Sequence, residues 1–233
     1  MQAARYGLRL HTHLAAHVGE IDYCLERFGC RPVDYMAEVG WLGPNVWLAH
    51  GIFFSAEERM RLGRAGVAIC HCPTSNMITA SGFCPVPDLE AAGVSVGLSV
   101  DGSSANDGSS MIGEVRQAFL LQRVVHGVGR VSAADALRWG TVGGAACLGR
   151  PEIGALAPGM QADLALFRAD SLAFTGADDA LAALVRSAPP RADRVMVAGS
   201  WIVEEGRLPG LDTAALAEAH AEAARGLRTR AGV

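Results

Sequence analysis

The chain has 233 residues, of which 50% are hydrophobic and 19% are charged, and its formal net charge at pH 7 is −4. This composition is too apolar for a disordered chain and is sufficient for one or two domains with buried cores. Without a basic excess, nucleic acid and acidic membrane surfaces are poor candidates for the partner. We therefore expect a globular protein that acts on a small molecule.

Targeting signals and cysteine usage indicate the compartment. The first seven residues lack the apolar segment of a signal peptide, and no run of 18 uncharged apolar residues occurs, so we expect neither secretion nor a membrane span. The six cysteines are too scattered for the disulfide framework of a small secreted domain. We expect reduced thiols in a cytoplasmic protein.

Residues 8–14 read as a short strand that carries His11 and His13. Positions two apart on a strand share a face, so both imidazoles would project to the same side. A His-x-His pair at the C-terminal end of a strand is a common way to present two nitrogens to a transition metal. Taken alone, the pair is equally consistent with hydrogen-bonded histidines in a core strand.

Strand and helix patterns then alternate along the chain. Continuous apolar strands are predicted at 46–51, 67–71 and 94–101, with helices at 20–28, from 32 onwards and at 57–63, and a long loop at 72–85. Ser55 and Glu58 fit a capping box at the start of the third helix. Such alternation is typical of a parallel sheet covered on both faces.

Polar residues end the four predicted strands, namely His13, His50, His71 and Asp101. In a (β/α)8 barrel the chemistry lies at the C-terminal rim, on residues from the ends of several strands. A full barrel typically needs about 250 residues, and only four strands are visible here. The pattern predicts an α/β fold in which residues 1–150 form the second half of such a barrel.

The pattern changes after residue 150. A Gly/Pro-rich turn with a short strand at 153–167 and a hairpin at 194–203 predict a small β-domain segment over 151–210. Residues 211–227 predict a terminal surface helix with Asp212 as its N-cap, within a final segment 211–233. A half-barrel would leave strand edges unpaired, so we also expect a homo-oligomer.

Seven ordered motifs carry a resemblance that covers essentially the whole chain. They are His11-Thr-His-Leu-Ala, Leu48-Ala-His50-Gly, Cys72-Pro-Thr-Ser-Asn76-Met, Ser81-Gly-Phe-Cys-Pro85-Val, Val100-Asp101-Gly-Ser-Ser-Ala-Asn106-Asp, Glu114-Val-Arg-Gln-Ala118 and Gly159-Met-Gln-Ala-Asp163-Leu. Together they resemble the amidohydrolase superfamily, in particular the guanine and 8-oxoguanine deaminases and their s-triazine hydrolase relatives.

The resemblance implies a metal-dependent barrel with a small β-sandwich and one divalent metal, zinc first and iron second. It implies that His13 and Asp101 are metal ligands and that His50 holds or orients the attacking water, which makes His50 and Asp101 the catalytic candidates. Ser75 and Asn76 are expected to contact the substrate. The implied activity is deamination of a purine-like ring such as 8-oxoguanine or guanine, with an s-triazine or cytosine hydrolase as the alternative.

Two departures from the family pattern predict impaired activity. The family has two further ligands, a His-x-His at the end of its first strand, and this chain has no counterpart. The family also has an acid–base glutamate three residues after the fifth-strand histidine, where this chain has Ala16. The neighbouring His17 is a weak substitute because adjacent positions usually point apart. A non-catalytic remnant or truncated reading frame is therefore the alternative.

Other polar residues have simpler interpretations. Cys70, His71, Cys72 and Cys84 could form a zinc site, but structural zinc sites usually repeat a Cys-x(2–4)-Cys pair, so a strand end and loop are favoured. Asp107 is expected in a solvated turn or as a helix cap. Glu114 and Arg116 are expected on a helix, where they would form surface pairs. His126 and His220 are expected on the surface.

Overall fold

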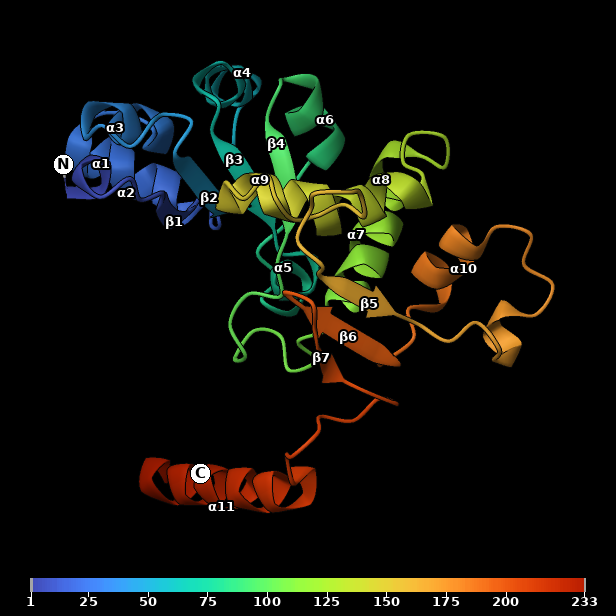
Figure 1. Cartoon of the computed structure of the whole chain (residues 1–233). Helices are drawn as coiled ribbons and strands as arrows, with labels where there is room; N and C mark the ends of the chain where they lie inside the picture. Colours follow the sequence, from blue (N-terminus) through green and yellow to red (C-terminus); the bar gives the residue numbers. More distant parts are fainter. Residues whose placement is uncertain (1, 233) are drawn as a thin grey trace.

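The computed structural model describes residues 2–232 and contains a four-stranded parallel sheet (Figure 1). The strands are β1 Leu10–Leu14, β2 Val46–His50, β3 Ala68–His71 and β4 Ser95–Leu98, in the order β1-β2-β3-β4. Thr12 is paired with Leu48, and Leu48 with Ile69. The sheet confirms the four predicted strands and their parallel arrangement, with β1 and β4 at its edges.

Helices and helical turns precede, connect and follow the strands. They are α1 Gln2–Arg5, α2 Gly19–Phe28, α3 Pro32–Glu38, α4 Ala56–Ala65, α5 Pro73–Ile78, α6 Val86–Ala91, α7 Met111–His126, α8 Ala133–Arg138, the π-helical turn Trp139–Gly143, α9 Gly144–Leu148, the 3-10 turn Leu172–Phe174, α10 Ala180–Ser187 and α11 Thr213–Ala231. The predicted capping box of Ser55 and Glu58 is present at the start of α4.

The predicted loop at 72–85 is partly wrong, because it contains α5. Pro73 occupies the first turn of this helix, where its fixed φ suits the helix and its missing N–H costs nothing. The Pro, Ser and Asn residues that favour a loop by composition therefore begin a helix here. This matters for function because α5 carries Ser75 and Asn76.

The two faces of the parallel sheet are packed differently. Leu48, Ile69 and Val96 belong to the main hydrophobic core, together with Leu62 of α4 and Leu89 of α6. On the other face, the small residues Ala68, Cys70 and Gly97 let α9 lie close against β3 and β4. A Cβ at Gly97 would be 2.9 Å from Sγ of Cys147, so this strand position requires glycine.

The face next to β1 is only partly covered. The predicted helix at 20–28 is confirmed as α2, but it has no buried residue, and Leu25 is 47% exposed. Along β1 itself, half-buried and exposed residues alternate, and no residue is fully buried. The helical periodicity was therefore predicted correctly, while the partner for its apolar side is not among the described residues.

A second, antiparallel sheet follows in the chain. It contains β5 Leu164–Leu166, β6 Arg194–Val197 and β7 Ser200–Val203 in the order β5-β6-β7. The hairpin between β6 and β7 turns at Ala198 and Gly199, both with positive φ (49° and 82°), as a two-residue type I′ turn requires. The hairpin is as predicted, but α10 separates β5 from β6, so the segment 151–210 is not purely β. The boundaries at 150 and 210 stay a prediction.

The last helix, α11, stands apart from the rest of the molecule in Figure 1. The side chain of Asp212 accepts hydrogen bonds from the N–H groups of Ala214 and Ala215, both 3.0 Å away, which confirms the predicted N-cap. α11 has no buried residue and extends to Ala231, beyond the predicted end. None of the helices described in residues 2–232 is both long and apolar enough to cross a lipid bilayer.

Candidate metal site

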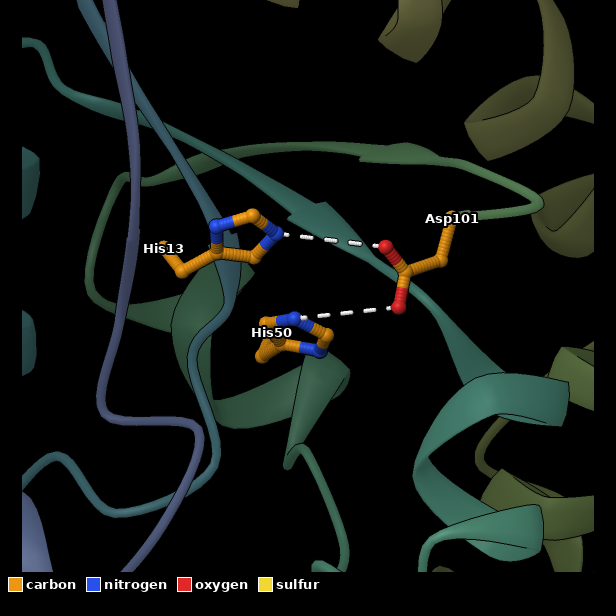
Figure 2. Close-up of side chains that lie close together, drawn as sticks. All are labelled: His13, His50 and Asp101. Atoms are coloured by element: carbon orange, nitrogen blue, oxygen red, sulfur yellow. Dashed lines mark ion pairs between the residues drawn. The ribbon is translucent and has the colours of Figure 1, made fainter. Parts of the chain in front are cut away.

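His13, His50 and Asp101 come together at the carboxyl ends of the parallel strands (Figure 2). Nε2 of His13 is 3.9 Å from Oδ1 of Asp101, and Nε2 of His50 is 4.0 Å from Oδ2 of the same carboxylate. The two imidazole rings stack with centroids 5.1 Å apart. Within residues 2–232, no other three His, Cys, Asp or Glu side chains gather closely enough to share a metal ion.

The backbone leaves the strand conformation at two of these residues. His50 has a φ of 74° and Asp101 a φ of 63°. The left-handed region costs a residue other than glycine roughly 1 kcal/mol or more, and such strain concentrates at functional sites. Gly51 follows with a φ of 64°, and a Cβ there would be 2.9 Å from Cγ2 of Ile69. The turn after β2 therefore requires glycine directly after His50.

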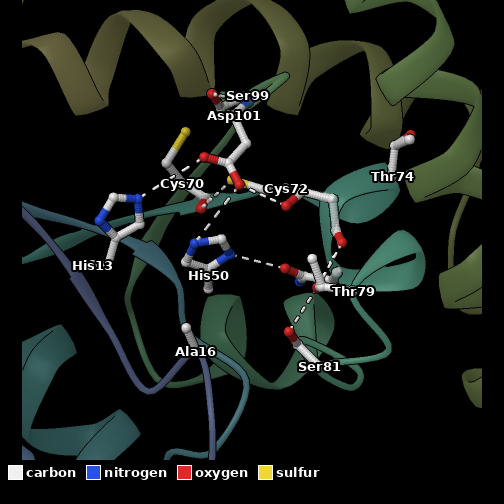
Figure 3. Close-up of polar contacts among 12 residues, drawn as sticks. His13, Ala16, His50, Cys70, Cys72, Thr74, Thr79, Ser81, Ser99 and Asp101 are labelled. Carbon is white, nitrogen blue, oxygen red and sulfur yellow. Dashed lines mark hydrogen bonds and ion pairs between the residues drawn. The ribbon is translucent and has the colours of Figure 1, made fainter. Parts of the chain in front are cut away.

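Two side chains from α5 form hydrogen bonds to the cluster, and Figure 3 shows His13, His50 and Asp101 among the surrounding polar residues. Oδ1 of Asn76 is 2.8 Å from Nδ1 of His50, and Oγ of Ser75 donates a hydrogen bond to Oδ2 of Asp101 at 2.5 Å. Ser75 and Asn76 are 2% and 1% exposed. Because Asn76 presents a carbonyl oxygen, Nδ1 of His50 carries the ring proton and Nε2 keeps its lone pair. The free lone pair of His50 therefore faces Asp101.

Asp101 is held in its charged form. Burial alone raises the pKa of this carboxyl group, but the hydrogen bond from Ser75, the N–H of Gly102 and the nearby His50 and His13 together lower the pKa below its usual value. At neutral pH the cluster therefore offers one carboxylate and two imidazole nitrogens, which is a donor set that divalent zinc and iron accept.

The histidine pair of β1 is divided between two environments. The ring of His11 stacks on Trp47 with centroids 3.6 Å apart, and its Nδ1 lies 3.2 Å from the carbonyl oxygen of Trp47. Only His13 reaches the cluster, and its side chain is 63% exposed. Of the two interpretations of the pair, metal binding therefore applies to His13 alone, because Trp47 engages the ring of His11.

His71 is the strand-end residue that stays outside the cluster. It is fully buried, and neither ring nitrogen has a hydrogen-bond partner. Burial and the neighbouring His50 lower the pKa of His71 to about 3, so its ring is neutral.

The segment after β1 shows how the position of the family's glutamate is filled. The N–H groups of Ala15, Ala16 and His17 donate to the carboxylate of Glu20 at 2.7, 2.8 and 3.0 Å. Nδ1 of His17 accepts a hydrogen bond from the N–H of Gly19, 3.0 Å away. The His17 ring is thus engaged by the start of α2, and Ala16 offers no group that can carry a proton.

Glu114 was predicted to form a surface pair, and this is wrong. Its side chain is 2% exposed, and it accepts hydrogen bonds from the N–H of Thr74 and from Nδ2 of Asn106. No sequence signal pointed to these contacts, because one of them runs to a backbone N–H 40 positions away. Arg116 forms no ion pair with any residue in the range 2–232, and its Nε donates to the carbonyl oxygen of Arg186 at 2.8 Å.

Asp107, His126 and His220 were predicted at the surface or in a solvated turn. Asp107 and His220 are exposed, as expected. His126 is half-buried against Phe83, with ring centroids 5.6 Å apart, so its predicted surface position is only partly correct.

The cysteines behave as predicted. All six are free thiols, and Cys70, Cys72 and Cys84 are buried without forming a metal-type group among the described residues. Burial, with Asp101 nearby, raises the pKa of Cys72 to about 12. Cys70 packs against Cys147 of α9. Cys70 and His71 are the last residues of β3, and Cys72 directly precedes α5.

A parallel sheet whose carboxyl ends carry two histidines and an aspartate is typical of metal-dependent barrel enzymes. The model of the amidohydrolase family matches residues 1–202, and the chain belongs to this family. The resemblance seen in the seven motifs is thereby confirmed.

Two curated relatives indicate the subgroup. The chain is 59% identical over 225 residues to an 8-oxoguanine deaminase from Pseudomonas aeruginosa. This match covers 97% of this chain and 50% of the relative. It is 38% identical over 225 residues to a hydroxydechloroatrazine ethylaminohydrolase from Pseudomonas sp. strain ADP. That match covers 93% of this chain and 46% of the relative. The chain thus spans about half the length of these relatives.

Solved structures agree with the half-barrel. An adenosine deaminase from Xanthomonas campestris with bound zinc superposes with a TM-score of 0.93 at 29% identity, over 98% of this chain and 53% of that chain. An atrazine chlorohydrolase from Arthrobacter aurescens in complex with zinc superposes with a TM-score of 0.88 at 32% identity, over 93% of this chain and 49% of that chain. The predicted partial barrel is confirmed.

Proposed function

We propose that this chain provides one half of a metal-dependent aminohydrolase that releases ammonia from a purine-like ring such as 8-oxoguanine or guanine. The cluster of His13, His50 and Asp101 at the rim of the sheet carries the proposal. The similarity to an 8-oxoguanine deaminase supports this substrate class. The similarity to a triazine aminohydrolase supports an s-triazine, and a cytosine is the third candidate.

The cluster fits one divalent metal, with zinc first and iron second. Two ligands that each lie about 2.1 Å from one ion are at most about 4.2 Å apart, and Nε2 of His13 lies 3.9 Å from Oδ1 of Asp101. One imidazole and one carboxylate also leave net positive charge on a divalent ion. A metal bound here would lower the pKa of a water molecule at the site towards 7.

The protein residues then have distinct roles. Nε2 of His13 and the carboxylate of Asp101 hold the metal. Nε2 of His50 accepts a hydrogen bond from the attacking water, in an orientation fixed by Asn76. Asp101, which is charged at neutral pH, accepts a proton from the same water. Ser75 and Asn76 are buried against the cluster, so we propose that they orient Asp101 and His50, and contact with the substrate stays a prediction for both.

Two features limit the rate expected from the chain alone. The two first-strand histidines implied by the family resemblance have no counterpart in these 233 residues. At Ala16 no side chain can move a proton to the ring nitrogen, and general acid–base catalysis commonly contributes roughly 10²–10⁴ in rate. These features also favour the second candidate, a non-catalytic remnant of an aminohydrolase.

The test joins this chain to the complementary half of the Pseudomonas aeruginosa relative and measures ammonia release from 8-oxoguanine, guanine, cytosine and a hydroxylated triazine. We expect slow, zinc-dependent release that Asp101→Asn abolishes and that Val124→Ala, at an 82% exposed position, leaves unchanged. Absence of release from all four rings, even after Ala16→Glu, would favour the non-catalytic remnant.

A further inference from the structure

A buried carboxylate outside the cluster joins the two segments that support it. Glu114 lies in the first turn of α7 and is 2% exposed. Its Oε2 accepts a hydrogen bond from the N–H of Thr74 at 3.1 Å, and its Oε1 accepts one from Nδ2 of Asn106 at 2.9 Å. Thr74 belongs to α5, whereas Asn106 belongs to the loop that follows Asp101.

The bond to Thr74 caps a helix that has no cap of its own. Cys72, at the N-cap position of α5, makes no side-chain hydrogen bond to the helix. The first N–H groups of a helix lack partners within it, and Pro73 has no N–H, so Thr74 is the first donor that needs an acceptor. A carboxylate at this position is also favoured by the helix dipole. Glu114 supplies the missing cap from a different helix.

The next residues of α5 contact the cluster directly. Ser75 donates to Asp101, and Asn76 lies against Nδ1 of His50. Because Thr74 precedes them on the same short helix, a shift of the first turn would move both contacts.

The bond to Asn106 holds the other segment. Asn106 is 4% exposed, and its Oδ1 accepts a hydrogen bond from the N–H of Ser109 at 3.2 Å. The loop that begins at Asp101 is therefore tied at Asn106 to the same carboxylate as α5. Glu114 thus connects to Asp101 through both segments and to His50 through α5.

We propose that Glu114 is a positioning residue of the cluster, which holds α5 and the loop after Asp101 in register and thereby fixes the ring tautomer of His50 and the orientation of Asp101. The use of that cluster in catalysis rests on the proposed function, but the hydrogen bonds themselves do not require a metal. A buried carboxylate is costly unless hydrogen bonds compensate for its desolvation. Glu114 therefore depends on the two donors as much as they depend on Glu114.

The decisive variant is Glu114→Gln, which keeps the size of the side chain but turns an NH2 group towards one of the two donors. We expect the ring ¹⁵N spectrum of His50 to change from a single Nδ1–H tautomer to a mixture. We also expect zinc to bind about tenfold more weakly, as is common when the support of a metal ligand is removed. Arg116→Ala, on the same helix, should change neither quantity.

A double variant tests whether the hydrogen bonds, and not the packing, are responsible. In Glu114→Gln combined with Asn106→Asp, the new amide can donate to the new carboxylate and still accept from Thr74, so both measurements should return towards those of the parent. Should Glu114→Gln fail to fold, Asn106→Ala removes one contact and takes its place with the same two measurements.

The outcomes separate this proposal from the proposed function. A His50 spectrum unchanged by Glu114→Gln, or no recovery in a folded double variant, would overturn the positioning role while zinc binding could persist. If the parent chain binds no zinc, the proposed function fails, and the His50 spectrum alone decides the positioning role.

Discussion

Nδ1 of His50 and Oδ1 of Asn76 lie 2.8 Å apart in a buried pair. The pair links the end of β2 to α5 and leaves Nε2 of His50 as the only ring nitrogen free to act at the cluster. The orientation of a catalytic imidazole is thus set by a residue that need not touch the metal.

Removing this contact should slow the reaction. Asn76→Ala takes away the acceptor that orients His50 towards the attacking water, and we expect ammonia release by the joined protein to slow about 10–100-fold. Asn76→Asp keeps an acceptor oxygen and should lose less activity. Equal losses in both variants would show that the hydrogen bond to His50 is not the cause. Met77→Ala, at the exposed next position, is the matched control.

His71 should make the stability of the fold depend on pH. Its pKa is lowered to about 3 in the folded protein, whereas the unfolded value is about 6.5. Between these values the unfolded chain binds a proton that the folded chain does not, so the free energy of unfolding falls as the pH decreases, by up to about 1.4 kcal/mol per pH unit. In urea titrations from pH 7 to pH 4, His71→Leu should flatten this slope. Parallel curves for parent and variant would contradict the buried, neutral state of His71.

Restoring the acid–base residue should raise activity in the joined protein described above. Ala16→Glu there should increase the rate of ammonia release by roughly 10²–10⁴, the usual share of general acid–base catalysis. The effect should require the metal as well, because residues that act as one catalytic unit are strongly non-additive. A parent that already matches its Ala16→Glu variant on any of the four rings would assign the proton transfer to another group, with His17 as the first candidate.

The unpaired edge of β1 and the exposed helices α2 and α11 should promote self-association. β1 is an edge strand, α2 exposes apolar residues such as Phe28 (42% exposed), and α11 has no buried residue. Unpaired strand edges and exposed apolar surface favour self-association. We expect dimers or larger species in sedimentation velocity experiments at micromolar concentration. A monodisperse monomer that unfolds cooperatively would contradict the expectation.

The sequence predicted the cluster because its residues lie at or just after the carboxyl ends of strands, and the ends of parallel strands meet at one edge. His13, His50 and Asp101 needed only that rule and the family resemblance. The support of the cluster could not be predicted in the same way. Glu114 meets Thr74, which lies 40 positions away in the chain, through a backbone N–H, and no residue pattern reveals such a contact.

Two further differences have similar causes. Composition favoured a loop where α5 forms, because Pro73 is compatible with a loop and equally with the first turn of a helix. The periodicity of α2 predicted its apolar side correctly but could not show that this side lacks a partner among the described residues. Patterns in sequence specify elements and faces, whereas the partner of each face depends on the whole fold.

We propose that His13 and Asp101, with His50 beside them, form part of a divalent-metal site. Zinc titration of the purified chain, followed by chelator competition, tests it most directly. We predict one weakly bound zinc per chain, with at least about tenfold loss of affinity in His13→Ala and in Asp101→Asn. His11→Ala should change little, since that ring stacks on Trp47. Zinc that stays bound in full stoichiometry after dialysis, and equally in His13→Ala, would contradict the assignment of the site.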